Sequence, residues 1–260
     1  MNQFQTGYAD PAARAATEAV AYADTQTRLG FLRKVYTIFG GAMVVWMGTT
    51  LAITMTPSLM EFTLPLMGSG FLGFLLLMGA MFLLLRMTAN SFPLNLVGIG
   101  LFAVLEGFLT APLVYLGLAS GNPEAMNLLA QGQFTSSILS QGGGIVTQAF
   151  VLTASVFGGL TAYALTTKRD FLWMRGALWM GFFGLMAIVL LSFFGIGGGI
   201  VGSWGFSLAF VILMGGFVLY DTQNIMKRYP ENMAVAAAAT LLIDFIIMFK
   251  HILILLMNRR

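Results

Sequence analysis

The sequence has no cysteine, a single histidine and few charged residues. Without cysteine the chain has no disulfides, no thiolate nucleophile and no cysteine-based metal site. Charged residues make up 9% of the 260 positions, whereas a soluble domain carries about 25%. The net charge of +3 is too small to indicate a nucleic-acid partner. A chain with so little charge is not expected to fold in water.

The sequence is instead rich in long hydrophobic runs. Hydrophobic residues make up 58% of the chain, and the mean hydropathy is +0.86. A membrane-spanning helix needs about 20 mostly apolar residues. Seven runs meet this requirement, at roughly 35–55, 67–88, 93–118, 145–166, 175–195, 204–226 and 234–257. We therefore predict an all-α, polytopic membrane protein whose first partner is the lipid bilayer.

The N-terminal stretch differs from the rest. Residues 1–30 are polar and alanine-rich and lack the apolar segment of a secretory signal. We predict a polar cytoplasmic tail over residues 1–30, followed by one seven-helix transmembrane domain over residues 31–260. Ten of the thirteen Lys and Arg residues fall before span one or in every second loop, and such residues mark the cytoplasmic side. Arg259 and Arg260 oppose this topology, which leaves six spans plus a re-entrant last segment as an alternative.

Two carboxylates stand inside the last two apolar runs. Asp221 lies in the sixth predicted span and Asp244 in the seventh, where a charge costs several kcal/mol and usually faces a bundle interior or a wet cavity. A short polar break separates the spans, so their helices are predicted to be antiparallel neighbours. The pair could sense protons, hold a hard cation such as Ca²⁺, or act as an aspartyl-protease dyad. Alternatively, each carboxylate is paired with a Lys or Arg and is structural.

Four further polar residues are candidates for buried sites. Glu106 lies in the middle of the third predicted span. Arg86, at the end of the second, is the expected countercharge, although its side chain could equally extend to the cytoplasmic face. His251 follows Asp244 by seven residues, on the same helix face, and Lys250 beside it needs a partner or an interface.

Enzyme motifs are weak. Residues 197–202 match G-x-G-x-x-G, but a dinucleotide site needs a surrounding βαβ unit, and this stretch lies between two apolar runs. Tyr220 and Asp221 resemble half of a presenilin-type protease site, yet Asp244 lacks the expected Gly-x-Gly before it. We therefore expect a protein that is not an enzyme and has no cofactor.

Several stretches together resemble the Bax inhibitor, or transmembrane Bax inhibitor motif, family in its bacterial form. They are FLRKVYTIFGG at 31–41, FAVLEGFLTAPLVY at 102–115, TAYALTTKRDF at 161–171, LYDTQNIM at 219–226 and LLIDFIIMF at 241–249. The resemblance implies a seven-helix bundle around a central C-terminal helix, located in the bacterial inner membrane.

The resemblance also implies a function, a pH-sensitive calcium leak channel. Asp221 and Asp244 match the aspartates that sense protons and bind Ca²⁺, Arg86 matches a latch residue, and Glu106 matches an acidic position in helix three. The usual Asp-x-x-Asn-Leu-Phe pattern reads Asp-Phe-Ile-Ile-Met-Phe from Asp244, so one amide is missing. The alternative function is regulation of a membrane-anchored ATP-dependent protease through the tail.

Overall fold

The structure is a computed structural model that describes residues 25–63, 79–81, 83–86, 88, 93–131, 133–134, 139–197 and 199–259. The described part is helical, and six of its helices are long and apolar enough to cross a membrane. These six are α2 (Thr25–Met55), α6 (Leu94–Ala119), α8 (Leu139–Thr166), α9 (Arg175–Phe193), α10 (Trp204–Arg228) and α11 (Ala234–Met257). Four short helices connect or flank them: α3 (Pro57–Glu61), α7 (Pro123–Ala130), η3 (Leu172–Met174) and η4 (Glu231–Met233).

Six of the seven predicted spans correspond to these long helices. The predicted span at 67–88 lies mostly outside the described residues, although 79–81, 83–86 and 88 are helical. The arrangement of all seven spans therefore stays a prediction. Most of the predicted tail, residues 1–24, also lies outside the described part, while residues 25–30 already belong to α2.

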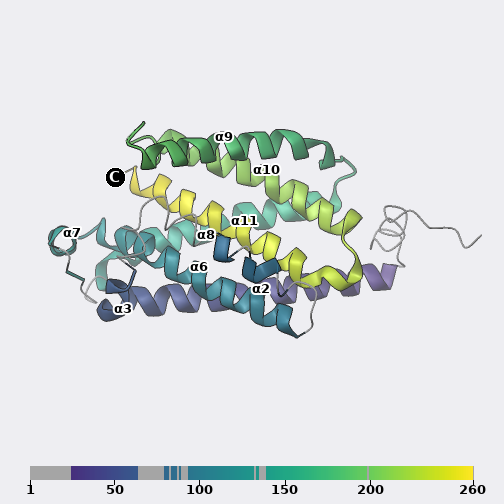
Figure 1. The fold of residues 1–260 in the computed structure, drawn as a ribbon, viewed down its shortest axis with the longest axis horizontal. Coiled ribbons are helices and arrows are strands. Elements are labelled where there is room, and N and C mark those ends of the chain that lie inside the picture. The colour runs from purple at the N-terminus through teal and green to yellow at the C-terminus, as the bar shows by residue number, and fades with distance from the viewer. Residues whose placement is uncertain are drawn as a thin grey trace, which may run out of the picture.

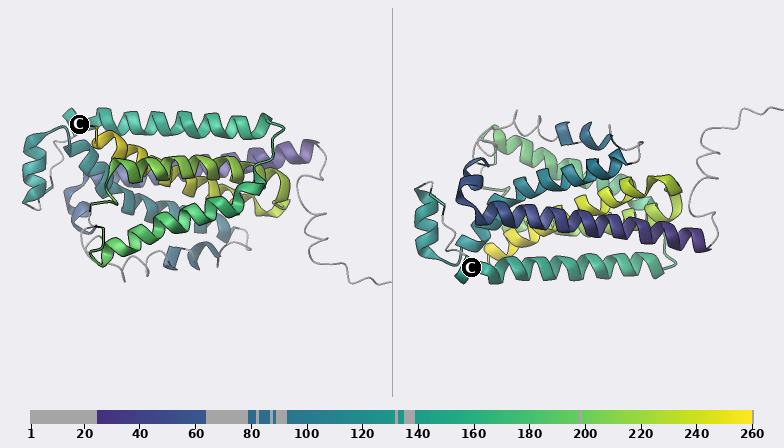
Figure 2. Two further views of the ribbon diagram at one scale, coloured as in Figure 1. Left: turned by 90° about the horizontal axis from the view of Figure 1, so that it is seen from above. Right: turned by 90° about the horizontal axis from the view of Figure 1, so that it is seen from below.

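The long helices lie side by side (Figure 1), and most of the Lys and Arg residues in the described part of the chain belong to segments at one end of the bundle. This basic end holds the start of α2 with Arg28, the connection between α8 and α9 with Lys168, and the connection between α10 and α11 with Lys227. Figure 2 shows from two further sides that the start of α2 and the connection from α10 to α11 share this end. The alternation of charge in the sequence thus corresponds to a real spatial separation.

Helix α11 packs against α2, α6, α8 and α10. Phe245 lies at the centre of an aromatic cluster, because its ring centroid is 5.4 to 6.3 Å from those of Phe157, Phe150, Trp46 and Phe39. Helices in a bilayer associate through close packing rather than through exclusion of water. These ring contacts fix the position of α11 in the part of the bundle that the structure describes.

Helices α2 and α6 approach each other closely. Trp46 Nε1 donates a hydrogen bond to Thr110 Oγ1 over 3.3 Å, and Thr50 Oγ1 donates one to the Gly107 carbonyl over 3.4 Å. A Cβ atom on Gly107 would lie 2.8 Å from the Cβ of Thr49 and 3.0 Å from the Trp46 carbonyl oxygen. Only a glycine permits this contact between the two backbones.

Candidate ion site on helices 10 and 11

Asp221 and Asp244 meet between α10 and α11. Both are buried, with 8% and 4% of their surface exposed, and their carboxyl groups lie within hydrogen-bonding reach of each other. Asp244 Oδ2 is buried and has no hydrogen-bond partner among the described residues. An ionised carboxylate can only accept hydrogen bonds. Two carboxyl groups in contact therefore need a proton or a cation between them.

The connection between the helices explains why the two residues meet. Asp221 lies about 10 Å along α10 from its end, and Asp244 lies about 15 Å along α11 from its start, at 1.5 Å per residue. The start of α11 is alanine-rich, and Ala237 and Ala238 are fully buried. Small side chains let the two helices lie close together. The two depths differ by about one helical turn, and the close packing of the helices brings the carboxyl groups together.

Tyr229 lies next to this pair, between the two helices. Its hydroxyl is 3.4 Å from Thr240 Oγ1. Burial raises the pKa of Tyr229, the hydrogen bond with Thr240 acts in the opposite direction, and the nearby Asp221 and Asp244 raise the pKa further. Tyr229 was not among the residues predicted from sequence, because a tyrosine in a polar break carries no signal of its own.

No ion pair joins the two aspartates to a cation in the described part of the chain, where the two ion pairs are Lys227–Asp170 and Lys250–Glu106. Arg86, predicted as a latch or countercharge, is exposed. The structure therefore brings Asp221 and Asp244 together without placing Arg86 in contact with them. This arrangement differs from the structural alternative, in which each aspartate would be paired with a Lys or Arg.

The donor set is small for a resident metal. The described residues contain no group of three or more His, Cys, Asp or Glu side chains that could hold a metal ion. Ca²⁺ takes six to eight oxygen ligands, and two carboxylates supply at most four. The two carboxylates alone therefore do not complete the coordination of Ca²⁺.

Glu106 has a different partner from the predicted one. Lys250 Nζ donates a hydrogen bond of 2.7 Å to Glu106 Oε2, linking α6 to α11. The side chains are 24% and 12% exposed, respectively. The countercharge of Glu106 is therefore Lys250 and not Arg86, because Lys250 comes from a helix that packs directly against α6.

His251 is packed among aromatic rings. Its imidazole stacks on Phe210, with ring centroids 4.1 Å apart and an angle of 4° between the planes, and Phe206 lies 6.0 Å away. Its buried Nδ1 has no hydrogen-bond partner among the described residues. The contacts of His251 are therefore with α10 aromatics rather than with Asp244.

Sequence reasoning missed a polar clamp beside the aspartate pair, formed by Gln223 and residues 167–171. Gln223 Oε1 accepts a hydrogen bond from the Phe171 N–H over 2.8 Å, and its Nε2 donates to the Arg169 carbonyl over 2.7 Å. Asp170 and Lys227 add an ion pair of 3.2 Å. The pKa of Asp170 is lowered by the Leu172 backbone N–H and then by Lys227.

The clamp joins two stretches that the sequence marks separately, TKRDF and LYDTQ. Its location could have been suspected because both stretches carry polar residues at the ends of apolar runs. Its contacts could not have been predicted, because Gln223 binds backbone groups, and every residue type carries the same backbone groups. The clamp holds the α8–α9 connection against the last turns of α10. Its α10 residue, Gln223, lies two residues beyond Asp221.

These features define a polytopic helical membrane protein with a buried carboxyl pair. The family model for Bax1-I, "Inhibitor of apoptosis-promoting Bax1", matches residues 28–260, and the chain belongs to this Bax inhibitor-1 family. It is 30% identical to mouse protein lifeguard 4, covering 90% of this chain and 87% of the relative. It is 28% identical to Bax inhibitor 1 of Schizosaccharomyces pombe, with 91% and 79% covered.

Similarity extends to a viral protein and to bacterial proteins. A Golgi anti-apoptotic protein of Vaccinia virus is 29% identical, with 92% of this chain and 89% of the relative covered. An uncharacterized protein of Campylobacter jejuni is 34% identical, but the match spans 62% of this chain and 60% of that relative. For a Pseudomonas aeruginosa protein, 38% identical, the match spans 38% and 43%. The resemblance predicted from the sequence is thereby confirmed at the level of the family.

Proposed function

We propose that this protein is a pH-sensitive calcium leak channel, in which Asp221 and Asp244 sense protons and transiently bind Ca²⁺. The observation that supports the proposal is the buried carboxyl pair, which lacks a cationic partner among the described residues. Ionisable groups within membrane spans are costly and usually mark an ion or proton pathway. A purely structural pair would be expected to have a Lys or Arg beside it.

The proposed mechanism uses two arrangements of the pair. With a proton between them, the carboxyl groups of Asp221 and Asp244 hold α10 and α11 together. When the proton is lost, two like charges repel, and a divalent cation can take the place of the proton. Because α11 also packs against α2, α6 and α8, a shift at Asp244 changes packing across the bundle. Arg86 would serve as a countercharge only after a rearrangement, since its side chain is exposed.

The test is calcium flux into dye-loaded proteoliposomes. We expect flux from the native protein and a several-fold lower flux from Asp221→Asn/Asp244→Asn, which keeps the size of both side chains and removes both charges. Glu231→Gln is the matched control, because Glu231 is an exposed acid at the same end of the bundle, and it should leave the flux unchanged.

Two outcomes would contradict the proposal. One is flux in the double variant equal to that of the native protein. The other is no flux above that of empty liposomes. The second result would turn attention to the alternative role, binding of a membrane-anchored ATP-dependent protease, which is tested by co-purification with and without residues 1–24.

A further inference from the structure

Gln223 lies two residues beyond Asp221 on α10 and faces a different side of the helix. With 3.6 residues per turn, the two positions are about 200° apart around the helix axis. Asp221 reaches Asp244 on α11, whereas Gln223 contacts the connection between α8 and α9. Figure 1 shows α10 between α9 and α11. The two side chains therefore attach the same stretch of α10 to opposite neighbours.

Both halves of the Gln223 amide are used. The side chain is 2% exposed; its Oε1 accepts a hydrogen bond from the Phe171 N–H, and its Nε2 donates one to the Arg169 carbonyl. Lys227, one turn further along α10, donates to Asp170 Oδ1 over 3.2 Å and to Gln223 Oε1 over 3.4 Å. A buried amide whose donor and acceptor are both paired holds one orientation. Gln223 and Lys227 thus attach the last two turns of α10 to residues 169–171.

Gly216 provides a second contact on the same face of α10. It precedes Gln223 by seven residues, which places both on one side of the helix. A Cβ atom on Gly216 would lie 2.6 Å from Leu178 Cδ2 of α9, so α9 and α10 pack closely there. The side of α10 opposite to Asp221 is therefore held at two levels, by Gly216 and by Gln223.

The elements packed against α10 and α11 carry several other ionisable groups. Together with those of α10 and α11 themselves, they are Arg28, Arg33, Lys34, Tyr36, Glu106, Tyr115, Tyr163, Lys168, Arg169, Asp170, Arg175, Tyr220, Lys227, Arg228, Tyr229, Glu231, Lys250 and His251. Of these, Tyr229 lies against the carboxyl pair. Neither aspartate forms an ion pair with a Lys or Arg of the described part of the chain.

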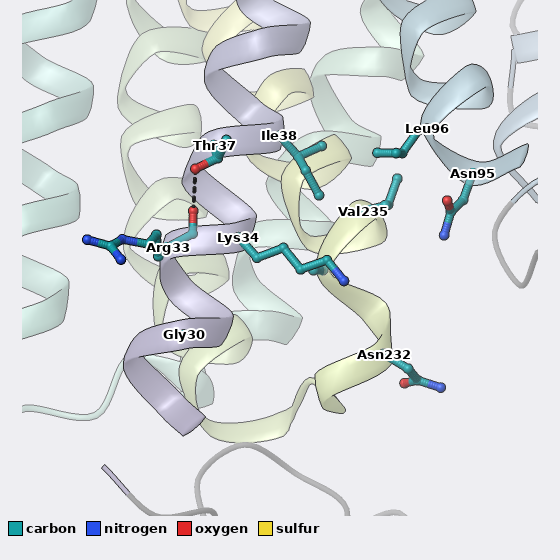
Figure 3. A pocket seen from close by; sticks show the side chains of 10 residues that line it. Gly30, Arg33, Lys34, Thr37, Ile38, Asn95, Leu96, Asn232 and Val235 are labelled. Carbon is teal, nitrogen blue, oxygen red and sulfur yellow. Dashed lines mark hydrogen bonds between the residues drawn. The ribbon is translucent and has the colours of Figure 1, made fainter. Parts of the chain in front are cut away.

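The basic residues of α2 lie at a different depth from the carboxyl pair. Arg33 and Lys34 line a cavity at the start of α11, beside Val235 (Figure 3). Val235 precedes Asp244 by nine residues, or about 14 Å along the helix. In Figure 3 the guanidinium of Arg33 also points away from α11. The separation of the two carboxyl groups is therefore the main determinant of how readily the pair holds a proton.

We propose that Gln223 is a positioning residue for this pair: it holds the end of α10 so that the carboxyl group of Asp221 stays against that of Asp244, and it thereby sets the pH at which the pair loses its proton. The proposal rests on the proposed role of the pair as a proton sensor. Two carboxylates held close together repel, which favours retention of the proton. Without the Gln223 contacts the end of α10 can move away from α11, the repulsion falls, and the proton is lost at a lower pH.

The experiment is an infrared titration of the full-length protein in liposomes, because a protonated carboxyl group absorbs at a different frequency from a carboxylate. The band of the pair is identified by its loss in Asp221→Asn/Asp244→Asn. No calcium is added, so the result does not depend on whether the protein conducts this ion.

The test variant is Gln223→Met, which keeps the length of the side chain and removes its hydrogen bonds to residues 169 and 171. Gln148→Met is the matched control, because it makes the same substitution at an exposed position of α8. Gly107→Ala controls for loss of stability alone, since it disturbs the contact between α2 and α6. If Gln223→Met does not fold, Gln223→Asn replaces it, because its amide is one methylene too short for the same contacts.

We expect the pH midpoint of the band to fall by about 0.5–1 unit in Gln223→Met, and by a smaller amount in Gln223→Asn. Gln148→Met and Gly107→Ala should keep the native midpoint, although Gly107→Ala unfolds at a lower temperature. The expected fall in a protein that shows no calcium flux would support the inference and contradict the proposed channel.

Three results would overturn the inference. One is a native midpoint in the Gln223 variants. Another is an equal fall in Gly107→Ala, which would mean that the midpoint follows stability and not the position of α10. The third is a native band that does not respond to pH.

Discussion

At the scale of single residues, the buried ionisable side chains have two kinds of partner. Glu106 is paired with Lys250, so that each charge compensates the other. Asp221 and Asp244 have only one another in the described part of the chain, which makes their state depend on protons or cations. The sequence identified all of these ionisable residues, because a charge within an apolar run is conspicuous. It did not identify the Glu106–Lys250 pair, whose members are 144 positions apart.

The Glu106–Lys250 pair leads to a prediction about stability. Lys250→Met should destabilise the protein, by about 3 kcal/mol or less, because Glu106 is left without its partner; loss of one member of a fully buried pair costs 3–5 kcal/mol, and this pair is partly exposed. Lys250→Met combined with Glu106→Leu should recover most of the loss. Thermal unfolding in detergent measures both effects. A double variant as unstable as the single one would show that the pair does not act through charge compensation.

At the scale of helices, hydropathy was sufficient to locate six spans, and the short polar break was sufficient to pair α10 with α11. Side-chain contacts between helices that are distant in the sequence could not be predicted from it. The approach of α2 to α6 at Gly107 depends on backbone positions, and glycine is frequent throughout the chain, with 31 residues. The Gln223 clamp depends on backbone groups of residues 167–171 in the same way.

The glycine contact gives a matched pair of substitutions on α6. Gly107→Ala should destabilise the protein by about 1–3 kcal/mol, because the added methyl group would overlap Thr49 and the Trp46 carbonyl. Gly100→Ala should be neutral or stabilising by up to about 1 kcal/mol, since nothing lies within 4 Å of its added Cβ. Unfolding temperatures of the two variants test this difference. Equal effects of the two substitutions would mean that the close contact between α2 and α6 at Gly107 does not determine the stability of the protein.

At the scale of the whole molecule, the directions of the helices and the positions of Lys and Arg indicate the same topology. Helices α2 and α6 both begin at the basic end, so the chain has to return between them, as the predicted span at 67–88 would do. The C-terminus lies at the other end of the bundle (Figure 1). We propose that the basic end faces the cytoplasm of a bacterium, with the bundle in the inner membrane, because Lys and Arg are enriched on that side.

Reporter fusions test this topology. A cytoplasm-active reporter should function when fused before residue 1, and a reporter that requires export should function when fused after Arg260. Seven spans place the two ends on opposite sides. Cytoplasmic activity at both ends would contradict seven spans and favour six spans with a re-entrant last segment, which would place Arg259 and Arg260 on the cytoplasmic side.

The most direct test of the central claim is the pH profile of calcium flux. The Asp170–Lys227 pair does not contribute there, because the pKa of Asp170 lies below its ordinary value of 3.8. Its stabilising effect is complete above that value and is lost only as the pH falls below it. We predict that calcium flux through the native protein and through Glu231→Gln rises between about pH 6 and pH 8, because loss of the shared proton lets Ca²⁺ enter the site. The flux through Asp221→Asn/Asp244→Asn should not change over this range. A double variant with the native pH response would contradict the account.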